Sequence, residues 1–329
     1  MMFLMMTFFS TIMSISSNSW MGVWVGMEIN LLSIIPLMNN SKNLMESEAS
    51  IKYFITQALA STIFLFSIII MSMNFSFNFK MLAMMLILNS SLLTKMGAAP
   101  FHFWFPEIME GLNWTNNMIM LTWQKITPMI ILMYNKMFFF LSIIIIISMI
   151  ISSLMSLNQT SLRKILTYSS INHIGWMMSS FFFLESIWNL YFIIYSIMTI
   201  NMIIMFKYLN IFYFKQLFYS MNNNFYLKMI FIINFLSLSG LPPFLGFLPK
   251  WITIQSMISN KILFLPMIMI MLTLMMMFIY LRITFSTLMI MSNEMNSFLF
   301  KKSNKYLWMT TNLTILMSFI FYTFMLNWL

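Results

Sequence analysis

Apolar stretches of about twenty residues follow one another along most of the chain, separated by short connections rich in Asn, Ser and Lys. A helix rises about 1.5 Å per residue, so such stretches span the roughly 30 Å hydrocarbon core of a bilayer. Charged residues make up only 7% of the sequence, too few to cover a water-exposed surface. The alternating polarity of membrane β-strands is not found in the sequence. We therefore expect an all-α, polytopic integral membrane protein.

The spacing of these stretches predicts about eleven membrane-spanning helices in a single transmembrane domain that covers residues 1–329. No connection is long enough to form a soluble domain, and the longest runs over residues 208–226. The helices are expected near residues 2–17, 21–38, 50–72, 81–110, 114–134, 137–156, 163–184, 187–207, 227–258, 262–290 and 305–326.

The fourth and ninth expected helices are too long for one straight span, and the same motif interrupts both. It reads G-x-x-P-F-x-x-x-x-P and begins at Gly97 and at Gly240, 143 residues later. Proline lacks an N–H and frees a carbonyl one turn earlier, which is tolerated at membrane depth only inside protein or beside water. Broken helices at matching positions are typical of transporters, where they mark the ion path. Two unrelated proline kinks are the alternative.

The same offset predicts an internal repeat of five helices. It pairs residues of about 1–136 with residues of about 137–290, and leaves an extra C-terminal helix over about 305–326. Five crossings are an odd number, so the second repeat would enter the membrane with the opposite orientation. This is the inverted-repeat plan of an antiporter-like transmembrane domain.

Four charged side chains lie inside expected spans rather than at their ends: Glu28, Lys95, Lys125 and Lys250. A charge at the bilayer centre costs about 2.5–3.5 kcal/mol on insertion scales, so four unpaired charges would cost about 10 kcal/mol. That sum is comparable with the stability of a whole soluble domain. We expect these side chains to face one another, water or freed carbonyls, and to form a proton path. Fixed ion pairs with no transport role are the alternative.

The chemistry of these residues suits proton transfer. Lys125 lies in the middle of its expected span, and a lysine donates hydrogen bonds when charged and accepts one when neutral. Lys95 precedes the first interruption and Lys250 ends the second. Glu28 is a natural partner for one of these lysines. His173 lies within the seventh expected span and titrates in a range that suits a relay, although a hydrogen-bonded packing role is an equal alternative.

Other ionisable residues carry weaker predictions. His102 lies at the first interruption, where a structural role beside freed carbonyls is favoured. Glu107 and Glu110 are expected near an aqueous face, with proton uptake as a further possibility. Arg163 and Lys164 follow a polar loop, and are most simply signals of membrane orientation.

Composition excludes several kinds of site. The chain has no Cys and two His, so disulfides, zinc–thiolate sites, ordinary iron–sulfur ligation and a multi-histidine metal site are not expected. It also lacks a glycine-rich dinucleotide motif, so we expect no cofactor in this chain. The net charge of +10 is spread over many connections, which indicates orientation and contact with anionic lipids such as cardiolipin rather than nucleic acid.

Several long motifs resemble the chain 2 family of NADH-ubiquinone oxidoreductase, the antiporter-like membrane subunits of mitochondrial respiratory complex I. The likeness covers nearly the whole chain. A high Met content and the lack of any basic residue before Lys42, where an Arg-rich presequence would be expected, resemble the insect-like, mitochondrially encoded form and imply the mitochondrial inner membrane. The motifs are Ser19–Leu32, Lys95–Trp104, Leu121–Lys125, Ser161–Lys164 and Gly240–Trp251.

The resemblance implies a proton-translocating subunit that couples NADH-to-ubiquinone electron transfer in partner subunits to proton pumping. In the family a Glu–Lys pair corresponds to Glu28 and Lys95, the central lysine to Lys125 and the exit-side lysine to Lys250. NADH, FMN, iron–sulfur clusters and ubiquinone are expected in partner subunits. Chain 4, chain 4L and accessory subunits are the expected neighbours. Compared with bacterial relatives, three leading helices are expected to be missing, which leaves a lipid-facing gap.

Two other functions are compatible with the same residues. One is a free-standing cation/proton antiporter, although all seven acidic residues are glutamates and only Glu28 lies well inside a span, which argues against a cation site. The other is a structural scaffold in which the buried charges are merely satisfied in place.

Overall fold

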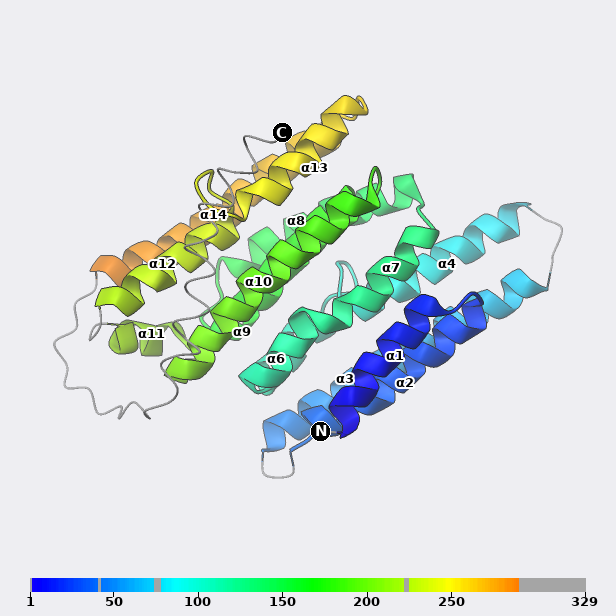
Figure 1. Ribbon diagram of the computed structural model, residues 1–329, viewed down its shortest axis with the longest axis horizontal. Helices are drawn as coiled ribbons and strands as arrows, with labels where there is room; N and C mark the ends of the chain where they lie inside the picture. Colours follow the sequence, from blue (N-terminus) through cyan, green and yellow to red (C-terminus); the bar gives the residue numbers. More distant parts are fainter. Residues whose placement is uncertain (1, 41–42, 74–77, 222–224, 290–329) are drawn as a thin grey trace. The chain divides into compact units, whose positions relative to one another are not determined.

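The structure is a computed structural model that describes residues 2–40, 43–73, 78–221 and 225–289. Over these residues it is all-helical, with fourteen α-helices, one 3-10 helix and no β-strand. The chain forms two compact units, Met1–Ser148 and Met149–Leu329, each of which is treated by itself (Figure 1). The all-α prediction is confirmed. The helix predicted over 305–326 lies outside the described residues.

The first unit contains four long helices followed by four short ones. They are α1 (Met2–Ser16), α2 (Trp20–Met38), α3 (Leu44–Ser72), α4 (Asn78–Met96), α5 (Trp104–Gly111), α6 (Trp114–Leu121), the 3-10 helix η1 (Trp123–Lys125) and α7 (Ile126–Tyr134). Helix α8 (Phe138–Ser156) crosses the boundary between the units.

The second unit consists of six further helices. They are α9 (Leu162–Ser180), α10 (Glu185–Leu209), α11 (Phe214–Met221), α12 (Phe225–Ser239), α13 (Phe247–Ser259) and α14 (Phe264–Met289). The sequence predicted a plain connection over 208–226, and the short helix α11 lies there instead. Leu217 and Met221 of α11 are buried, and α11 contacts both α12 and α14, so tertiary packing holds this segment in a helix.

Within the described residues, five helices are long and apolar enough to cross a membrane: α2, α3, α8, α10 and α14. Their outer faces are apolar, as lipid contact requires, and the buried face of α1 is polar instead. Its buried residues are Thr7, Ser10, Thr11 and Ser14, whose hydroxyls donate to carbonyls of their own helix. Small residues allow membrane helices to approach closely, because lipid gives apolar side chains no reason to turn inward.

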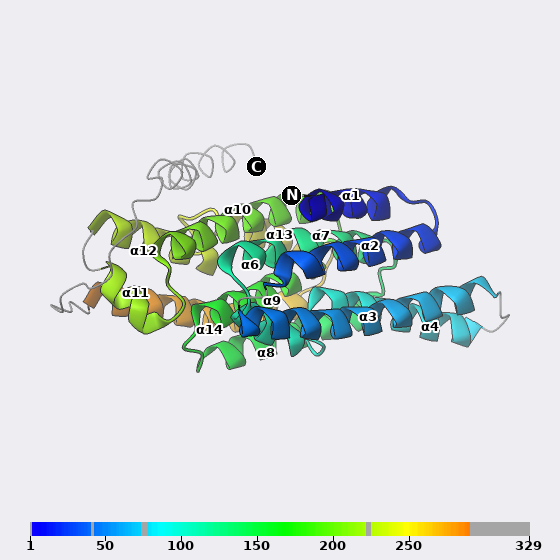
Figure 2. The ribbon, with the colours of Figure 1, turned by 90° about the horizontal axis from the view of Figure 1, so that it is seen from below.

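Packing in the first unit follows from this close approach. A Cβ added to Gly26 of α2 would lie 2.7 Å from Cβ of Ser14, so the two helices touch at their backbones. Helix α2 also packs on α3, and α3 packs on α4 and α5, as Figure 2 shows for α1, α2, α3 and α4. Helix α7 contacts both α1 and α4. In the second unit, α9 is buried along almost all of its length and contacts α10, α13 and α14.

Both predicted interruptions are present, between α4 and α5 and between α12 and α13, and their local structures match. Gly97 has a φ of 71° and Gly240 a φ of 77°, the left-handed conformation that ends many helices. Each is followed by the same pair of closing bonds, which satisfies the last carbonyls of the helix. These bonds are Gly97 N to Thr94 O (3.2 Å), Ala98 N to Leu93 O (3.1 Å), Gly240 N to Ser237 O (3.1 Å) and Leu241 N to Leu236 O (3.5 Å).

The sequence predicted one continuous helix over 114–134, and this prediction is wrong. The structure ends α6 at Leu121, inserts the 3-10 helix η1 and resumes as α7. Pro128 gives the physical reason, because its ring would clash with the carbonyl of Gln124 and it has no N–H to offer that carbonyl. A 3-10 turn inside a helix often marks a functional position, and Lys125 lies in this one.

We predict that Gly97→Ala weakens the first unit. Left-handed backbone costs a non-glycine residue about 1–2 kcal/mol, and the new Cβ would lie 3.1 Å from the Phe105 side chain. The readout is the temperature at which half of the chain is lost from the soluble fraction of detergent-treated native membranes. Ser90→Ala, which removes only a hydroxyl bonded within its own helix, is the control. Equal midpoints for both variants would contradict the prediction.

Candidate functional site

Lys95 lies in the last turn of α4 and is half-buried. Its ammonium donates to Sδ of Met27 at 3.6 Å and lies 5.9 Å from the centre of the Phe64 ring. Glu28, the next residue of α2 and itself half-buried, attracts the ammonium electrostatically. The structure therefore brings Lys95 to the segment of α2 that carries Glu28, although its hydrogen bond goes to a thioether, which is a weak acceptor.

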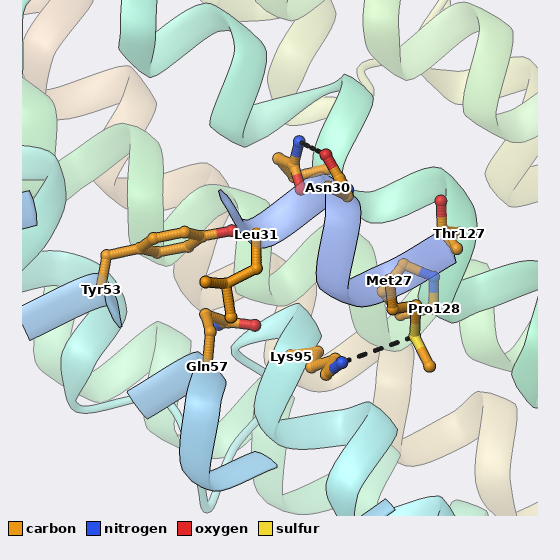
Figure 3. Close-up of a pocket in the computed structure, with 9 residues that line it drawn as sticks. Met27, Asn30, Leu31, Tyr53, Gln57, Lys95, Thr127 and Pro128 are labelled. Carbon is orange, nitrogen blue, oxygen red and sulfur yellow. Dashed lines mark hydrogen bonds between the residues drawn. The ribbon is translucent and has the colours of Figure 1, made fainter. Parts of the chain in front are cut away.

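A small polar cavity of about 20 Å³ lies beside Lys95, where α2, α3 and α4 meet the segment around η1 (Figure 3). A space of this size holds about one water molecule. Most of its walls are formed by side chains able to make hydrogen bonds, which is unusual inside a membrane domain. The lining residues are Met27, Asn30, Leu31, Tyr53, Gln57, Lys95, Gln124, Thr127 and Pro128.

A pair of amides joins α2 to the interrupted segment. Asn30 Nδ2 donates to Oε1 of Gln124 at 2.9 Å, and Gln124 Nε2 donates back to Oδ1 of Asn30 at 3.1 Å. Gln124 directly precedes Lys125 in η1. The reciprocal bonds therefore fix the turn that carries Lys125 against the helix that carries Glu28.

Lys125 is 2% exposed, the most deeply buried of the predicted lysines. Its ammonium lies 5.6 Å from the centre of the Phe105 ring, close enough for a favourable cation–π interaction. Phe105 belongs to the first turn of α5, directly after the first interruption, and packs against Gly97. The central lysine and the first broken helix thus meet in one place.

Lys250 lies in the first turn of α13, just after the second interruption, and is 7% exposed. Its ammonium donates to the carbonyl of Ser239, the last residue of α12, at 2.9 Å. The carbonyl end of a helix carries partial negative charge, so α12 provides a neutral binding site for a cation. A Cβ on Gly240 would lie 2.8 Å from this ammonium. The position therefore requires glycine for two reasons, its positive φ and the close approach of Lys250.

His173 lies on α9 and is 2% exposed. Its Nδ1 is 2.9 Å from the hydroxyl of Tyr191 on α10, and its ring packs 5.1 Å from the ring of Tyr195. The tautomer of the imidazole decides which of the two groups donates in the first contact. The histidine is therefore paired with a group that can both give and take a proton.

The predicted site residues are divided between the two units. The first unit contains Glu28, Lys95 and Lys125, and the structure links them through neighbouring residues of α2 and η1. The second unit contains His173 and Lys250. Among the described residues, no group of three His, Cys, Asp or Glu side chains is placed to hold a metal ion.

The sequence reasoning missed several polar residues that the structure places in or near the site. Asn30, Gln57 and Gln124 are amides within apolar helices, and that pattern alone was a usable signal, because unpaired amides are expensive in a membrane. Tyr191 had no such signal, since tyrosines are common in the chain. Lys228 of α12 is 8% exposed and donates to the carbonyl of Leu288 at 3.1 Å. It thereby satisfies a carbonyl in the last turn of α14.

The residues with weaker predictions lie outside these contacts. His102 is 3.3 Å from the carbonyl of Pro100 within the first interruption, in keeping with a structural role. Glu107 is exposed and forms an ion pair of 2.9 Å with Lys52, which also pairs with Glu48 at 3.0 Å. This network joins α5 to α3 near their exposed ends. The guanidinium of Arg163 lies 4.7 Å from the centre of the Phe212 ring.

Comparison with known proteins decides the family. Residues 17–276 match the model of the transmembrane family described as NADH:quinone oxidoreductase/Mrp antiporter. The chain belongs to this family. The matched range contains all five predicted site residues, and the resemblance expected from the sequence is confirmed.

Curated proteins with high similarity to this chain include two insect proteins. NADH-ubiquinone oxidoreductase chain 2 of Anopheles gambiae is 47% identical over 304 residues, 92% of this chain and 89% of that protein. The chain 2 protein of Aedes aegypti is 49% identical over 326 residues, 98% and 94% of the two chains. A chain of respiratory complex I from Thermus thermophilus, solved with bound aureothin, has a TM-score of 0.87 at 19% identity, covers 97% and 77% of the two chains, and shows the shared fold.

We predict that the Asn30–Gln124 pair is energetically coupled. Asn30→Ala and Gln124→Ala should each lower the thermal midpoint of the chain in solubilised membranes, because each leaves the other amide buried and unpaired. The double variant should lose less than the sum of the two, by a coupling of about 0.6 kcal/mol or more. Strictly additive losses would show that the two amides act independently.

Proposed function

We propose that the chain is a proton-translocating subunit of the membrane arm of respiratory complex I. In this role it couples NADH-to-ubiquinone electron transfer, carried out by partner subunits, to proton movement through the residues Glu28, Lys95, Lys125, His173 and Lys250. The observation that carries the proposal is the position of the lysines, which are buried or half-buried at the interruptions of apolar helices. Its membership of a family that contains the chain 2 proteins supports the same function.

The contacts of the three lysines favour a role in proton transfer over a role in permanent ion pairs. Lys95 donates to a sulfur, Lys125 faces an aromatic ring and Lys250 donates to a backbone carbonyl. The groups in these three contacts are neutral, so loss of the proton does not break a buried ion pair at any of them. Breaking a buried salt bridge would impose a penalty each time the proton moved.

The chain requires driving force from other subunits. Moving a proton against 100 mV costs about 2.3 kcal/mol, and the residues of this site supply no redox chemistry. The proposal places NADH, FMN, the iron–sulfur clusters and ubiquinone in partner subunits, with chain 4, chain 4L and accessory subunits as neighbours. It also places the chain in the mitochondrial inner membrane, in contact with lipids that include cardiolipin.

The proposal includes an architecture of about eleven spans with two inverted five-helix repeats, near 1–136 and 137–290, and a helix near 305–326. The matching bonds at the two interruptions support a repeat offset of 143 residues, because both the left-handed glycines and the closing bonds recur at that spacing. At the same offset Asn30 corresponds to His173, and Glu107 corresponds to Lys250. The repeats would therefore share a backbone fold while carrying different polar side chains at corresponding positions.

Membership of the complex is tested on a native gel of solubilised mitochondrial membranes, stained for NADH dehydrogenase activity and probed for this chain by mass spectrometry. We expect the chain in the active band, at the size of the intact complex. Its migration in a band without that activity would overturn the subunit proposal. A free-standing cation/proton antiporter would then be the better function, in keeping with the antiporters that the family description names.

We predict that Lys125→Met lowers coupled turnover by about tenfold or more while the complex still assembles, because the variant keeps most of the length of the side chain and removes its ionisable amine. Proton uptake and NADH oxidation would be measured together in proteoliposomes, with assembly followed on native gels. Lys136→Met, eleven residues along and after the end of α7, is the matched control. Unchanged turnover and proton yield in Lys125→Met would favour a structural scaffold.

We also predict a role for the hydroxyl of Tyr191. Tyr191→Phe keeps the ring and removes the group that lies 2.9 Å from His173, so proton-coupled turnover should fall. Tyr195→Phe removes a hydroxyl from the same helix, one turn later, and should be milder because Tyr195 meets His173 through its ring. Equal effects of the two variants on the proton yield in proteoliposomes would contradict a specific relay at Tyr191.

A further inference from the structure

The polar cavity of Figure 3 contains hydrogen-bonding groups that the protein leaves unused. Gln57 of α3 is 5% exposed, and its Nε2 is buried with no hydrogen-bond partner among the described residues. Thr127, in the first turn of α7, is 1% exposed, and its hydroxyl is also buried with no hydrogen-bond partner among the described residues. Both side chains line the cavity. Buried polar groups in folded proteins are almost always paired, so two orphans around one cavity indicate a ligand.

Lys95 also lacks a strong hydrogen-bond acceptor in this cavity. Its ammonium has three N–H groups, and the hydrogen bond that it makes goes to the sulfur of Met27. Figure 3 shows Lys95 and Gln57 on neighbouring walls of the cavity, reached from α4 and α3 respectively. Two side chains that carry nitrogen donors thus line one cavity, and neither donor has an oxygen acceptor among the hydrogen bonds of the described residues.

The size and the remaining walls of the cavity define the ligand. Its volume of about 20 Å³ is enough for about one water molecule. A bound cation is disfavoured, because the ammonium of Lys95 already brings positive charge to the cavity. A water oxygen accepts from both donors, and the oxygen-bearing side chains of Tyr53 and Gln124 line the same cavity to receive its two protons.

We propose that this cavity is a binding site for one ordered water, held between Nε2 of Gln57 and Nζ of Lys95. Gln57 is then a positioning residue, which acts on Lys95 through the water. The role of the site rests on the proposed function. The water gives the Lys95 ammonium an oxygen acceptor in addition to the sulfur of Met27, and it donates to the nitrogen lone pair when the lysine is neutral. The same site therefore satisfies both protonation states of the lysine.

The test is cryo-electron microscopy of the whole complex in lipid nanodiscs, at a resolution that resolves ordered waters. We expect a density peak at hydrogen-bonding distance, about 2.7–3.2 Å, from both Gln57 Nε2 and Lys95 Nζ. Gln57→Met, similar in length but without an amide, should lose the peak. Ser61→Ala is the matched control, since Ser61 is buried one turn along α3, bonds to its own helix and does not line the cavity.

Three results would overturn the inference. They are an empty cavity in the unmodified complex, a peak that persists in Gln57→Met, and a peak with the short contacts and sodium dependence of a bound cation. The density is observed whether or not the complex pumps protons. A dry cavity together with pumping that depends on Lys125 would therefore reject the water site alone. A hydrated cavity together with unchanged pumping in Lys125→Met would reject the proposed function alone.

Discussion

The need to satisfy polar groups inside hydrocarbon governs the rest of this structure. Every interruption of a helix leaves backbone carbonyls without helical partners, and every buried lysine requires acceptors. A lysine placed at an interruption can therefore satisfy both needs. The carbonyl of Ser239 at the end of α12 receives the ammonium of Lys250, and Phe105 after the first interruption faces Lys125. The broken helices are thus the places where this domain can hold charge at membrane depth.

The same constraint explains why the buried face of α1 is rich in hydroxyls and its outer face is apolar. In water the apolar side chains would turn inward, but lipid removes that preference and leaves close backbone contact as the main source of helix packing. Ser14 against Gly26 is the clearest case, and it holds α1 against α2, the helix that carries Glu28 and Asn30. Packing of small residues therefore positions one side of the candidate site.

Much of the fold and part of the site could be predicted from local sequence signals. Apolar length located the helices, and the shared G-x-x-P-F motif located two interruptions. The third interruption was missed, although Pro128 was a local signal for it, because the surrounding stretch looks like one uniform span. Charges in apolar segments identified the lysines, whereas the same reasoning applied to amides would also have found Gln57 and Gln124.

By itself the sequence determined the apolar, helical character of the chain, two of the helix interruptions and which ionisable residues lie within apolar segments, because apolar length and the chemistry of Gly and Pro act over a few neighbouring residues. The tertiary structure decided which partner each of those residues has. Asn30 bonds to Gln124 and Lys95 to Met27 across 94 and 68 positions of sequence. Such contacts depend on how whole helices pack, and in a membrane this is set by small residues and polar pairs whose partners no local pattern specifies.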